Sequence, residues 1–407
     1  MTSSSLLADA GRGCSGAQDA GTIFFRCFRD LVYDGPQQTQ GLLSTARQID
    51  KYNKGNAGTR MNGSHLLLQA CLSTILFAGA ANADEVADFY QGKSIEMQIA
   101  YTAGGGYDLY ARILSRHLGN HIPGKPTIIP KNSPGAGGLR LANWLYSVAP
   151  KDGTVLAAIG RTTPFEPLVG NSGAVKFDPI KFHYIGSGNN DVSVCAVWYA
   201  TGITKFEDAL EREVKVGGSG PGGDTDVFPP VLNGIFGTKF KLITGYPGGN
   251  DIDLAIERGE VDGRCGWSWS SIVSGHSEWL KAKKLNILMQ LALTKHLDLP
   301  DTPLLMNLAK SDEQRQILRL VFASQTLGRP YLTAPGVPSD RVAALRKAFG
   351  ATMKDPMFQQ EAATAKLELN PVSGEEVQQL VGDVFTTPKP TVEKVKAMLA
   401  VVDKTSR

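Results

Sequence analysis

The feature that most constrains the fold is an order of elements that the chain repeats: a strand, a glycine-rich turn and a helix. The order first appears in residues 95–118, where an apolar stretch precedes the glycines 104–106 and a segment with apolar side chains at helical spacing. It returns in residues 127–148, and again in residues 213–258 around the glycine loop 217–223. Strands and helices that alternate through short turns are typical of parallel, helix-flanked sheets. Because these units occur in two separate stretches, the sequence predicts an α/β protein of two lobes.

The order of the units also predicts how the lobes divide the chain. We expect residues 84–195 and 323–407 to form the first lobe, and residues 196–322 to form the second. An apolar stretch at residues 320–331 is a candidate strand that returns from the second lobe to the first.

The beginning of the chain differs in composition from the rest. Residues 1–60 are rich in Ser, Gly, Gln, Asn and Thr, and their one apolar island is too short for a domain. Residues 61–83 hold an apolar stretch of about 15 residues that ends at Ala81-Asn82-Ala83, the pattern of a cleavable signal peptide. We therefore expect residues 1–60 to lie outside the folded protein, translation to start near residues 50–61, and the exported chain to begin at Asp84.

Two of the five cysteines belong to the predicted mature chain. Cys14, Cys27 and Cys71 precede the cleavage site, and too few apolar residues precede Cys71 for it to carry a lipid anchor. In an oxidising compartment Cys195 and Cys265 could pair. The sequence does not place them within bonding distance, so it favours two buried thiols on strands and leaves the disulfide open.

The charge pattern excludes nucleic acid as a partner. The chain has 42 Lys and Arg residues against 39 Asp and Glu residues, and the two signs are interspersed. Nucleic-acid binding needs basic side chains gathered on one face. Partners are therefore expected among small molecules and proteins.

Motifs for catalysis and metal binding are missing from the sequence. The chain contains neither G-x-S-x-G nor H-E-x-x-H, and the glycines 104–106 do not fit the G-x-G-x-x-G pattern of a dinucleotide site. His117 and His121 are four residues apart, but Gly119 and Pro123 indicate that the helix ends there. We expect no cofactor, no metal ion and no enzyme activity.

The glycine turns lie where a solute would bind. In open parallel sheets, ligands bind outside the carboxyl ends of the strands, and each turn follows such an end. Each turn also precedes a helix, whose first N–H groups and positive dipole end favour an anion. Glycine lets the backbone approach the ligand closely. Turns from both lobes would converge on a carboxylate.

Four segments in order carry a resemblance to a known family. They are YTAGGGYDLYARIL (101–114), NSPGAGGLRLANWL (132–145), GYPGGNDIDLAIERGEVDG (245–263) and TAPGVPSDRVAALRKA (333–348). The chain resembles the extracytoplasmic receptors of tripartite tricarboxylate transporters, often called Bug-type receptors, over most of residues 95–385.

The resemblance implies a fold and a function. The fold is a type II periplasmic-binding-protein fold, with two α/β lobes joined by crossing strands. The lobes would close on a small carboxylate in the periplasm, with a hinge near Cys195 and Leu327, and the receptor would deliver its solute to membrane permease subunits. We expect a monomer.

The family's binding residues carry over to the matching turns. Gly104–Gly106 would hold a carboxylate through main-chain groups and waters, and Asp108 would reach an amine, hydroxyl or water, or else cap the helix. The turn at residues 135–138 would shape the wall of the pocket. The pair Thr162-Thr163 would offer hydroxyls, and Ser219–Thr225 would form the Gly/Ser loop of the second lobe.

The chemistry of other residues adds further candidates. Trp267 and Trp269 share one strand face, and Trp267 is expected to line the cleft, with core packing as the alternative. Arg161 and Arg264 lie near predicted strand ends, where a guanidinium could grip a carboxylate bidentately or form a surface salt bridge. Asp262 would brace the hinge or contact the solute. The candidate ligand-binding residues are Gly104, Gly105, Gly106, Asp108, Gly135, Gly137, Arg161, Thr162, Thr163, Ser219, Gly220, Asp224, Thr225, Tyr246, Asp262 and Trp267.

Three other functions are compatible with such a chain. It could serve an ABC importer, act as a sensory receptor, or be a secreted α/β enzyme. A neighbouring ATPase gene would favour an importer, whereas neighbouring genes for one large and one small permease subunit would favour a tripartite transporter. A hydrolase would need a nucleophile with a base and an orienting acid, which the sequence does not assemble.

Overall fold

The computed structural model describes residues 85–170 and 173–405, which all belong to one compact unit, Phe77–Arg407. The predictions for residues 1–84, including the signal peptide and the start of the exported chain, lie outside the described residues. No helix in the described part of the chain is long and apolar enough to cross a membrane. The same part holds no cluster of three His, Cys, Asp or Glu residues suited to a metal ion.

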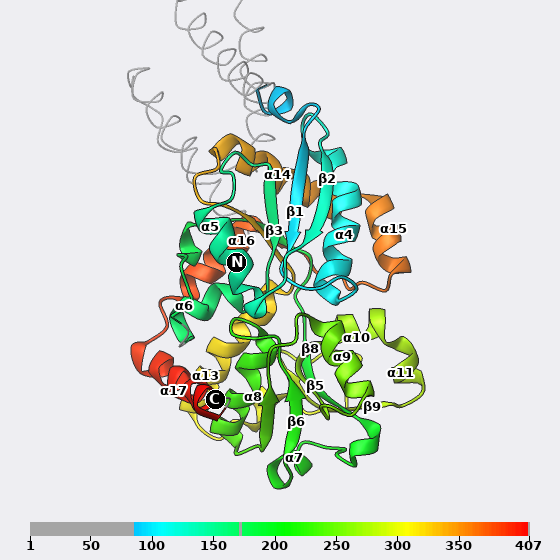
Figure 1. Ribbon diagram of the computed structural model, residues 1–407, viewed down its shortest axis with the longest axis vertical. Helices are drawn as coiled ribbons and strands as arrows, with labels where there is room; N and C mark the ends of the chain where they lie inside the picture. Colours follow the sequence, from blue (N-terminus) through cyan, green and yellow to red (C-terminus); the bar gives the residue numbers. More distant parts are fainter. Residues whose placement is uncertain (1–84, 171–172, 406–407) are drawn as a thin grey trace, which may run out of the picture. The chain divides into compact units, whose positions relative to one another are not determined.

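A six-stranded sheet forms the centre of the first lobe (Figure 1). Its order is β11-β4-β10-β3-β1-β2. Strand β1 runs parallel to β2 and β3, whereas β10 runs antiparallel to both of its neighbours, β3 and β4. The strands are β1 (Ser94–Ile99), β2 (Thr127–Asn132), β3 (Val155–Ala158), β4 (His183–Ser187), β10 (Pro330–Thr333) and β11 (Val372–Ser373).

Helices pack on this sheet and on one another. Helix α4 contacts β1 and β2, α14 contacts β4 and α4, and α16 contacts β4. All four residues of β3 are buried, as expected for a strand in the middle of a covered sheet. The helices are α4 (Gly106–Leu118), α5 (Leu139–Ser147), α6 (Glu166–Val169), α14 (Ser339–Met353), α15 (Pro356–Thr364) and α16 (Gly374–Val384).

The second lobe is built on a five-stranded sheet of order β7-β6-β8-β5-β9. Strand β6 runs parallel to β7 and β8, whereas β5 runs antiparallel to β8 and β9. The strands are β5 (Ser193–Trp198), β6 (Val214–Gly217), β7 (Phe240–Ile243), β8 (Gly263–Ser268) and β9 (Leu285–Leu291). The helices are α7 (Asp208–Glu211), α8 (Asp224–Phe236), α9 (Gly249–Glu257), α10 (Trp269–Gly275), α11 (Ser277–Lys281), α12 (Leu305–Leu308) and α13 (Asp312–Phe322).

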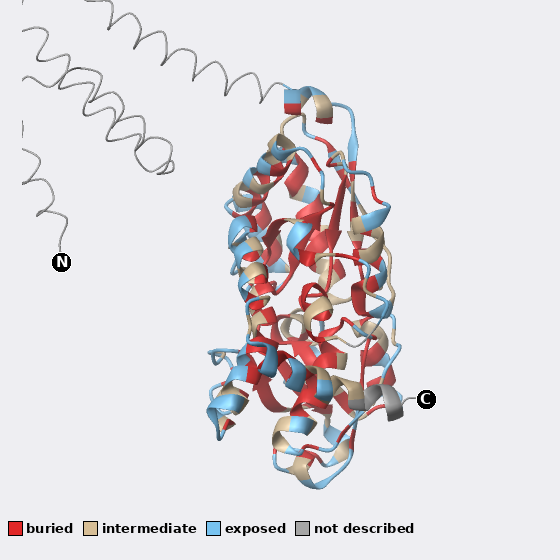
Figure 2. Cartoon of the chain, turned by 90° about the vertical axis from the view of Figure 1, so that its left-hand side faces the viewer, coloured by how far each residue is buried: buried red, intermediate tan, exposed pale blue. Residues whose placement is uncertain are grey.

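Two buried segments carry the chain between the lobes. Residues 188–192 connect β4 to β5, and residues 323–329 return from α13 to β10. Both are rich in polar residues, and most of these residues are buried, with Asn190 exposed. Buried residues fill the interior of both lobes (Figure 2). Later in the chain, α17 (Lys389–Thr405) packs against α8 and α13 of the second lobe and α6 of the first.

The predicted fold class is confirmed, since the described chain forms two helix-flanked α/β sheets joined by crossing segments. The strand-turn-helix units form parallel pairs, as predicted, but each sheet as a whole is mixed. Strands β5 and β10 are antiparallel to their neighbours because each enters its sheet from a crossing segment rather than through a strand-turn-helix unit.

The strand predicted over residues 320–331 is also wrong in most of its length. Residues 320–322 end α13, a short 3-10 helix occupies Ala323–Leu327, and β10 begins only at Pro330. Helix α13 buries Ile317, Leu318 and Val321, which are spaced as on one helix face. A short apolar run cannot by itself distinguish a strand from a buried helix end.

The favoured pair of free thiols is corrected to a disulfide between Cys195 and Cys265. Strands β5 and β8 are antiparallel neighbours, and their register sets these two residues directly opposite each other. Side chains opposite each other across two strands point to the same face, so the sulfur atoms meet. The register of two strands far apart in the sequence is not visible from cysteine spacing.

The helices begin in two different ways. Helices α4, α8 and α9 follow Gly105, Gly223 and Gly248, which carry no side chain that could cap the first turn. Helices α13 and α16 follow Ser311 and Ser373, whose hydroxyl groups accept backbone N–H groups of the first turn. The uncapped helix starts therefore leave N–H groups for another partner.

Candidate functional site

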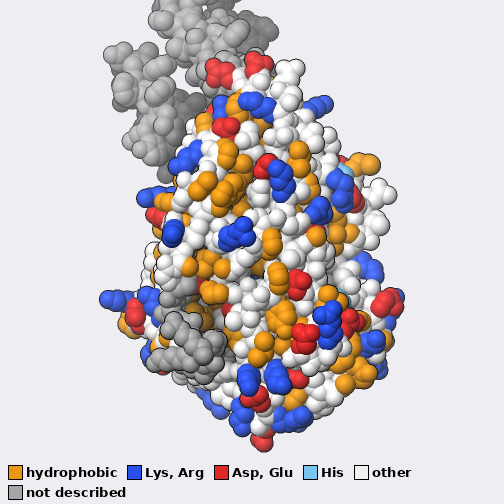
Figure 3. Space-filling view, viewed as in Figure 1, with side chains coloured by type: hydrophobic (Ala, Val, Ile, Leu, Met, Phe, Trp, Pro, Cys, Tyr) orange, Lys and Arg blue, Asp and Glu red, His pale blue; other side chains and the backbone are white. Residues whose placement is uncertain are grey.

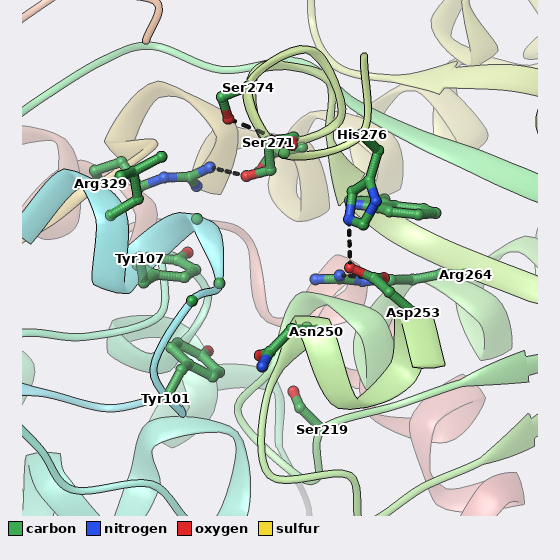
Figure 4. A pocket seen from close by; sticks show the side chains of 18 of the residues that line it. Tyr101, Tyr107, Ser219, Asn250, Asp253, Arg264, Ser271, Ser274, His276 and Arg329 are labelled. Carbon is green, nitrogen blue, oxygen red and sulfur yellow. Dashed lines mark hydrogen bonds and ion pairs between the residues drawn. The ribbon is translucent and has the colours of Figure 1, made fainter. Parts of the chain in front are cut away.

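A cavity of about 150 Å³ lies between the two lobes. Figure 4 shows Tyr101, Tyr107 and the first glycine turn on one side of it, and Arg264, Asp253 and His276 on the other. The lining residues are Tyr101, Gly104, Gly105, Gly106, Tyr107, Leu109, Arg161, Ser219, Asp224, Gly249, Asn250, Asp253, Arg264, Trp267, Ser268, Ser271, Ser274, Gly275, His276 and Arg329. Each lobe thus contributes a wall: the first mainly backbone and tyrosines, the second mainly charged and hydroxyl side chains.

The first glycine turn follows β1 and is braced from behind. Asp108 accepts a hydrogen bond from the N–H of Gly104 at 2.9 Å, and its carboxylate also binds Arg112 and Asn132 at 2.8 Å each. Burial raises the pKa of Asp108, but these hydrogen bonds outweigh it and lower the pKa below its usual range. Asp108 is not among the cavity-lining residues and does not cap α4 in the usual manner; its carboxylate braces the turn.

Gly106 is the point of closest approach between this turn and the second lobe. A Cβ atom there would lie 3.1 Å from Cβ of Ser271 and 3.2 Å from Nη2 of Arg329. At Gly105 a Cβ atom would meet nothing closer than 3.5 Å, and the backbone φ of −78° suits any residue. The need for glycine is therefore strict at Gly106 and weak at Gly105.

The second glycine turn packs directly against the second lobe, beside the cavity. The N–H of Gly137 donates to the carbonyl of Ser219 at 3.0 Å, and the carbonyl of Gly137 accepts from Tyr101 and Thr163. A side chain at Gly137, whose φ is +59°, would collide with the backbone of residues 220–223. The structure thus gives Gly137 a place in a contact between lobes, whereas Gly135 lies beside Arg140 of its own lobe; neither is among the cavity-lining residues.

The predicted hydroxyl loop joins the same contact. Thr162 donates to the carbonyl of Gly222 at 2.8 Å, and Thr163 lies within 3.3 Å of the same oxygen. Thr225 accepts a hydrogen bond from the N–H of Ser219. These threonines and Gly220 do not reach the cavity because their polar groups are used in holding loops together, whereas Ser219 and Asp224 do line it.

A buried ion network closes one end of the cavity. Arg161 lies 2.8 Å from Asp224 and 3.6 Å from Asp191, and Arg329 lies 3.2 Å from Asp191. Burial raises the pKa of Asp191, but the two guanidinium groups outweigh it and lower the pKa below its usual range. Gln325 and Ser268 take the remaining contacts of Arg161. Arg161, predicted as a clamp for the solute, is therefore already saturated by the protein.

Arg264 belongs to a second, less complete set of charges. Its Nη1 lies 3.4 Å from Asp253, and its buried Nε has no hydrogen-bond partner among the described residues. The other oxygen of Asp253 lies 2.8 Å from Nε2 of His276. Gly249 makes room for Arg264, since a Cβ atom there would stand 2.5 Å from Nη1.

Trp267 combines the two roles that the sequence left open. It lines the cavity, yet it is only 1% exposed and belongs to the apolar core of the second lobe. Its ring lies edge-on to His276 at 5.3 Å, and the guanidinium of Arg264 lies 5.3 Å from the ring centre. Trp267 thus supports both charged neighbours from the core side.

Two predicted residues lie away from the cavity lining. The carboxylate of Asp262 accepts the N–H of Lys215 at 2.7 Å, and its backbone bonds to Lys215 and Trp198, so Asp262 ties strands at the start of β8. Tyr246 is half-buried, and burial and the neighbouring Glu260 raise its pKa. Strand β8 has its ligand-facing end at Ser268, opposite the end that Asp262 occupies.

Several lining residues were not in the sequence-based candidate list. They are Asn250, Asp253, Ser271, His276 and Arg329. Asn250 ends the GYPGGN segment and Asp253 follows it, so a search along the first turns of glycine-started helices would have found them. His276 lies in the turn between α10 and α11, and Arg329 in the returning segment, where no motif marks them.

On the face shown in Figure 3, basic and acidic side chains are intermixed, with no single basic patch that covers the surface. This agrees with the near balance of charges in the sequence. The cavity, where charged side chains from distant segments meet, is the better candidate for a functional site.

No protein-family model matches the chain. A curated relative from Cupriavidus necator, a UPF0065 protein in gbd 5′region, is 34% identical over 112 residues, which are 28% of this chain. The match spans only 32% of that relative's length.

Solved structures match over a much larger part. R. palustris Rpa4515 with adipate has a TM-score of 0.60 at 15% identity and covers 76% of this chain and 98% of its own. The periplasmic binding protein BugD has a TM-score of 0.58 at 18% identity, and the match covers 78% of this chain and 99% of BugD. MatC from Rhodopseudomonas palustris with bound malate has a TM-score of 0.58 at 15% identity, and the match covers 76% of this chain and 99% of MatC.

Of these neighbours, BugD is a periplasmic binding protein, Rpa4515 holds adipate and MatC holds malate. The resemblance to Bug-type receptors and the predicted type II periplasmic-binding-protein fold are therefore confirmed at the level of the fold.

Proposed function

We propose that this protein is an exported, periplasmic receptor that encloses a small carboxylate between its two lobes. It would deliver this solute to the permease subunits of a tripartite tricarboxylate-type transporter. The observation that supports the proposal most is the cavity between the lobes, which a glycine turn faces on one side and Arg264 on the other.

Contacts between the lobes support a mechanism of closure. Thr102 donates to the carboxylate of Asp251 at 2.7 Å, and the side-chain amide of Asn250 donates to the carbonyl of Ala103 at 3.0 Å. These groups belong to the first glycine turn and to the start of α9, so the contacts form only when the lobes are together. The polar crossing segments 188–192 and 323–329 are the proposed hinge.

The first glycine turn is proposed to hold one carboxylate of the solute. Its helix starts after Gly105 without a side-chain cap, so N–H groups of the first turn are available to an anion. Gly104 has a φ of +89°, a conformation that glycine adopts without strain. Tyr101 and Tyr107, stacked at 4.7 Å, provide an apolar surface beside the turn.

The alternative of a secreted hydrolase has one point in its favour, the His276–Asp253 pair in the cavity. A hydrolase would also need a nucleophile hydrogen-bonded to the histidine. The four serines that line the cavity are bonded elsewhere. Ser219 pairs with Thr225, Ser268 with Arg161, Ser271 with Arg329, and Ser274 with a backbone carbonyl of α10. We therefore favour binding over catalysis.

A thermal-shift screen tests the proposal. Adipate should raise the melting temperature and adipamide, its neutral counterpart, should not; benzoate and benzamide form a second pair. At a concentration of 100 times Kd, binding to the native state alone adds about 2.7 kcal/mol to the free energy of unfolding. The variant Gly106→Val is the control, because it fills the space between turn and second lobe. Equal shifts with acids and amides, or unchanged shifts in the variant, would contradict the proposal.

The transport partner needs a separate test. Genes for a large and a small permease subunit beside this gene would support a tripartite transporter. An adjacent ATPase gene would favour an ABC importer, and an adjacent sensor kinase gene would favour a sensory role.

A further inference from the structure

The charged groups around the cavity fall into two sets that differ in how completely they are paired. In the first set, Arg161 and Arg329 face Asp191 and Asp224, so two positive charges balance two negative ones at 2.8–3.6 Å. The second set has one arginine, Arg264, one carboxylate and one imidazole. It lies on the opposite wall, in view of the cavity (Figure 4).

Arg264 has donors that the protein does not use. Its one carboxylate contact, with Asp253, is long, at 3.4 Å, and its Nε is buried without a partner among the described residues. The Nε of Arg329 is also unpaired there, but Arg329 has Asp191 at 3.2 Å and the hydroxyl of Ser271 at 2.8 Å, so its charge is held more closely than that of Arg264. A buried, unused N–H group is costly and usually finds a ligand or an ordered water. A guanidinium offers two parallel N–H groups to one carboxylate, so Arg264 can take an anion that lies in the cavity.

Asp253 divides its carboxylate between Arg264 and His276. The oxygen that contacts His276 is closer, at 2.8 Å, than the oxygen that contacts Arg264. Trp267 and Trp279 pack on the imidazole at 5.3 and 4.3 Å. Other charged groups near this turn are engaged elsewhere: Glu278 pairs with Lys281 on α11, and Lys366 from the first lobe bonds to Ser277.

An anion at Arg264 would upset the charge balance of this wall. Arg264 and Asp253 now cancel each other, so an entering carboxylate would place a second negative charge beside Asp253 in a largely buried site. Like charges a few ångströms apart repel strongly where water is excluded. A proton on the neighbouring imidazole would remove the imbalance, and histidine is the side chain that ordinarily changes its charge near neutral pH.

We propose that Arg264 anchors an anionic group of the solute and that His276 takes up a proton from solvent when the solute binds. With Nε2–H donating to Asp253, the proton enters at Nδ1, and the imidazolium then neutralises Asp253 while Arg264 turns to the solute. No covalent bond between heavy atoms changes. The inference rests on the proposed function, because it needs an anionic solute in this cavity, and it makes binding of that solute coupled to pH.

Calorimetric titration of the full chain with malate, adipate and benzoate, repeated in buffers of different ionisation heat, measures the protons taken up. We expect uptake of up to about one proton per solute bound, and affinity that falls by up to about tenfold per unit as pH rises above neutrality. In His276→Gln the uptake and the pH dependence should disappear, and Arg264→Gln should weaken binding at least about tenfold.

The matched control is His121→Gln. His121 forms a similar pair with Asp355 at 2.9 Å, but in the first lobe and away from the cavity, so this variant should bind and take up protons like the unaltered protein. Binding without proton uptake, or uptake that persists in His276→Gln, would overturn this inference and leave the proposed function intact. Failure of all three carboxylates to bind would overturn the proposed function, and the inference with it.

Discussion

The two walls of the cavity use charge in opposite ways. On the side of Arg161 and Arg329, each guanidinium contacts carboxylates and hydroxyls of the protein, and both arginines are at most 2% exposed. On the side of Arg264, the guanidinium has one long contact and an unused donor. Nε of Arg329 is unpaired as well, but Arg161 and Arg329 each have a carboxylate within 3.2 Å, and an added anion would compete with that contact. Arg264 has only the 3.4 Å contact to lose.

The comparison shows that the presence of an arginine in a cavity does not by itself identify a ligand anchor. Arg161 and Arg329 join the crossing segments to both lobes, so their pairing serves the closed structure. Arg264 lies in β8, the middle strand of the second-lobe sheet, and lines the cavity. The predictions below test this division, beginning with the largest expected effect.

Asp191→Ala should be the most damaging change, because it removes the carboxylate shared by Arg161 and Arg329. Leaving buried guanidinium groups uncompensated costs about 3–5 kcal/mol of unfolding free energy. Chemical denaturation measures the loss, and Asp312→Ala, at an exposed position paired with Arg315, is the control that should change stability little. If Asp191→Ala lowers the unfolding free energy no more than the control does, the ion network of Arg161 and Arg329 does not stabilise the fold.

Gly106→Val should reduce affinity for the solute at least about a hundredfold, which is about 2.7 kcal/mol. The new side chain would occupy the space against Ser271 and Arg329 and hold the lobes apart. Titration calorimetry with the best carboxylate measures the effect, and Gly105→Ala is the paired control because a Cβ atom fits there. Equal losses in both variants would mean that the turn acts through its flexibility, not through the close approach at Gly106.

Thr102→Val should weaken solute binding by about fivefold, since it removes a hydrogen bond of about 1 kcal/mol that joins the two walls only in the closed form. Thr364→Val, which removes a hydroxyl bonded within α15, should leave affinity unchanged. If Thr102→Val binds as tightly as the control, the contact between the first turn and α9 does not contribute to closure.

The smallest expected effect concerns pH and a contact outside the cavity. His296, in the loop after β9, lies 3.5 Å from Glu368, which follows α15 in the first lobe. Its hydrogen bond to Glu368 raises the pKa of His296, although burial acts in the opposite direction. The stabilisation is therefore fully present below the pKa of histidine in the unfolded chain, and it is lost as pH rises through the higher pKa of the folded protein.

His296→Gln should flatten this part of the pH dependence of stability, by less than about 1 kcal/mol because the pair is partly exposed. Unfolding measured across the pH range near neutrality, in the unaltered protein and the variant, provides the comparison. Asp298 and Asp191 also raise the pKa of His296, so all three carboxylates favour its charged form. The unaltered protein should therefore lose more stability than the variant as pH rises. If the unaltered protein instead gains stability relative to His296→Gln as pH rises, the proposed role of this contact is contradicted.

The sequence predicted the repeated units well because each carries its own local signal. Apolar spacing and glycine position predict the turn before α4, but they predict the exact bounds of few strands. The resemblance of four segments then led to the correct fold. Arg264 was also proposed as a clamp from its place near a strand end, and the structure sets it in the cavity wall.

What the sequence could not predict depends on contacts between distant segments. The disulfide requires the register of β5 on β8, and the pair of Asp253 with His276 joins α9 to the turn between α10 and α11. Local patterns also cannot tell that Arg161 is saturated, because Asp224 and Asp191 come from the second lobe and from a crossing segment. Such cross-lobe pairs appear only once the fold brings the segments together.

The central claim is that one carboxylate-bearing solute is enclosed between the two walls. A crystal structure of the chain with the carboxylate that gives the largest thermal shift tests it most directly. We predict electron density for the solute in the cavity, with one end at the turn of Gly104–Gly106 and an anionic group within hydrogen-bonding distance of Arg264. A solute bound outside this cavity, or one that pairs with Arg161 while Arg264 stays on Asp253, would contradict the account.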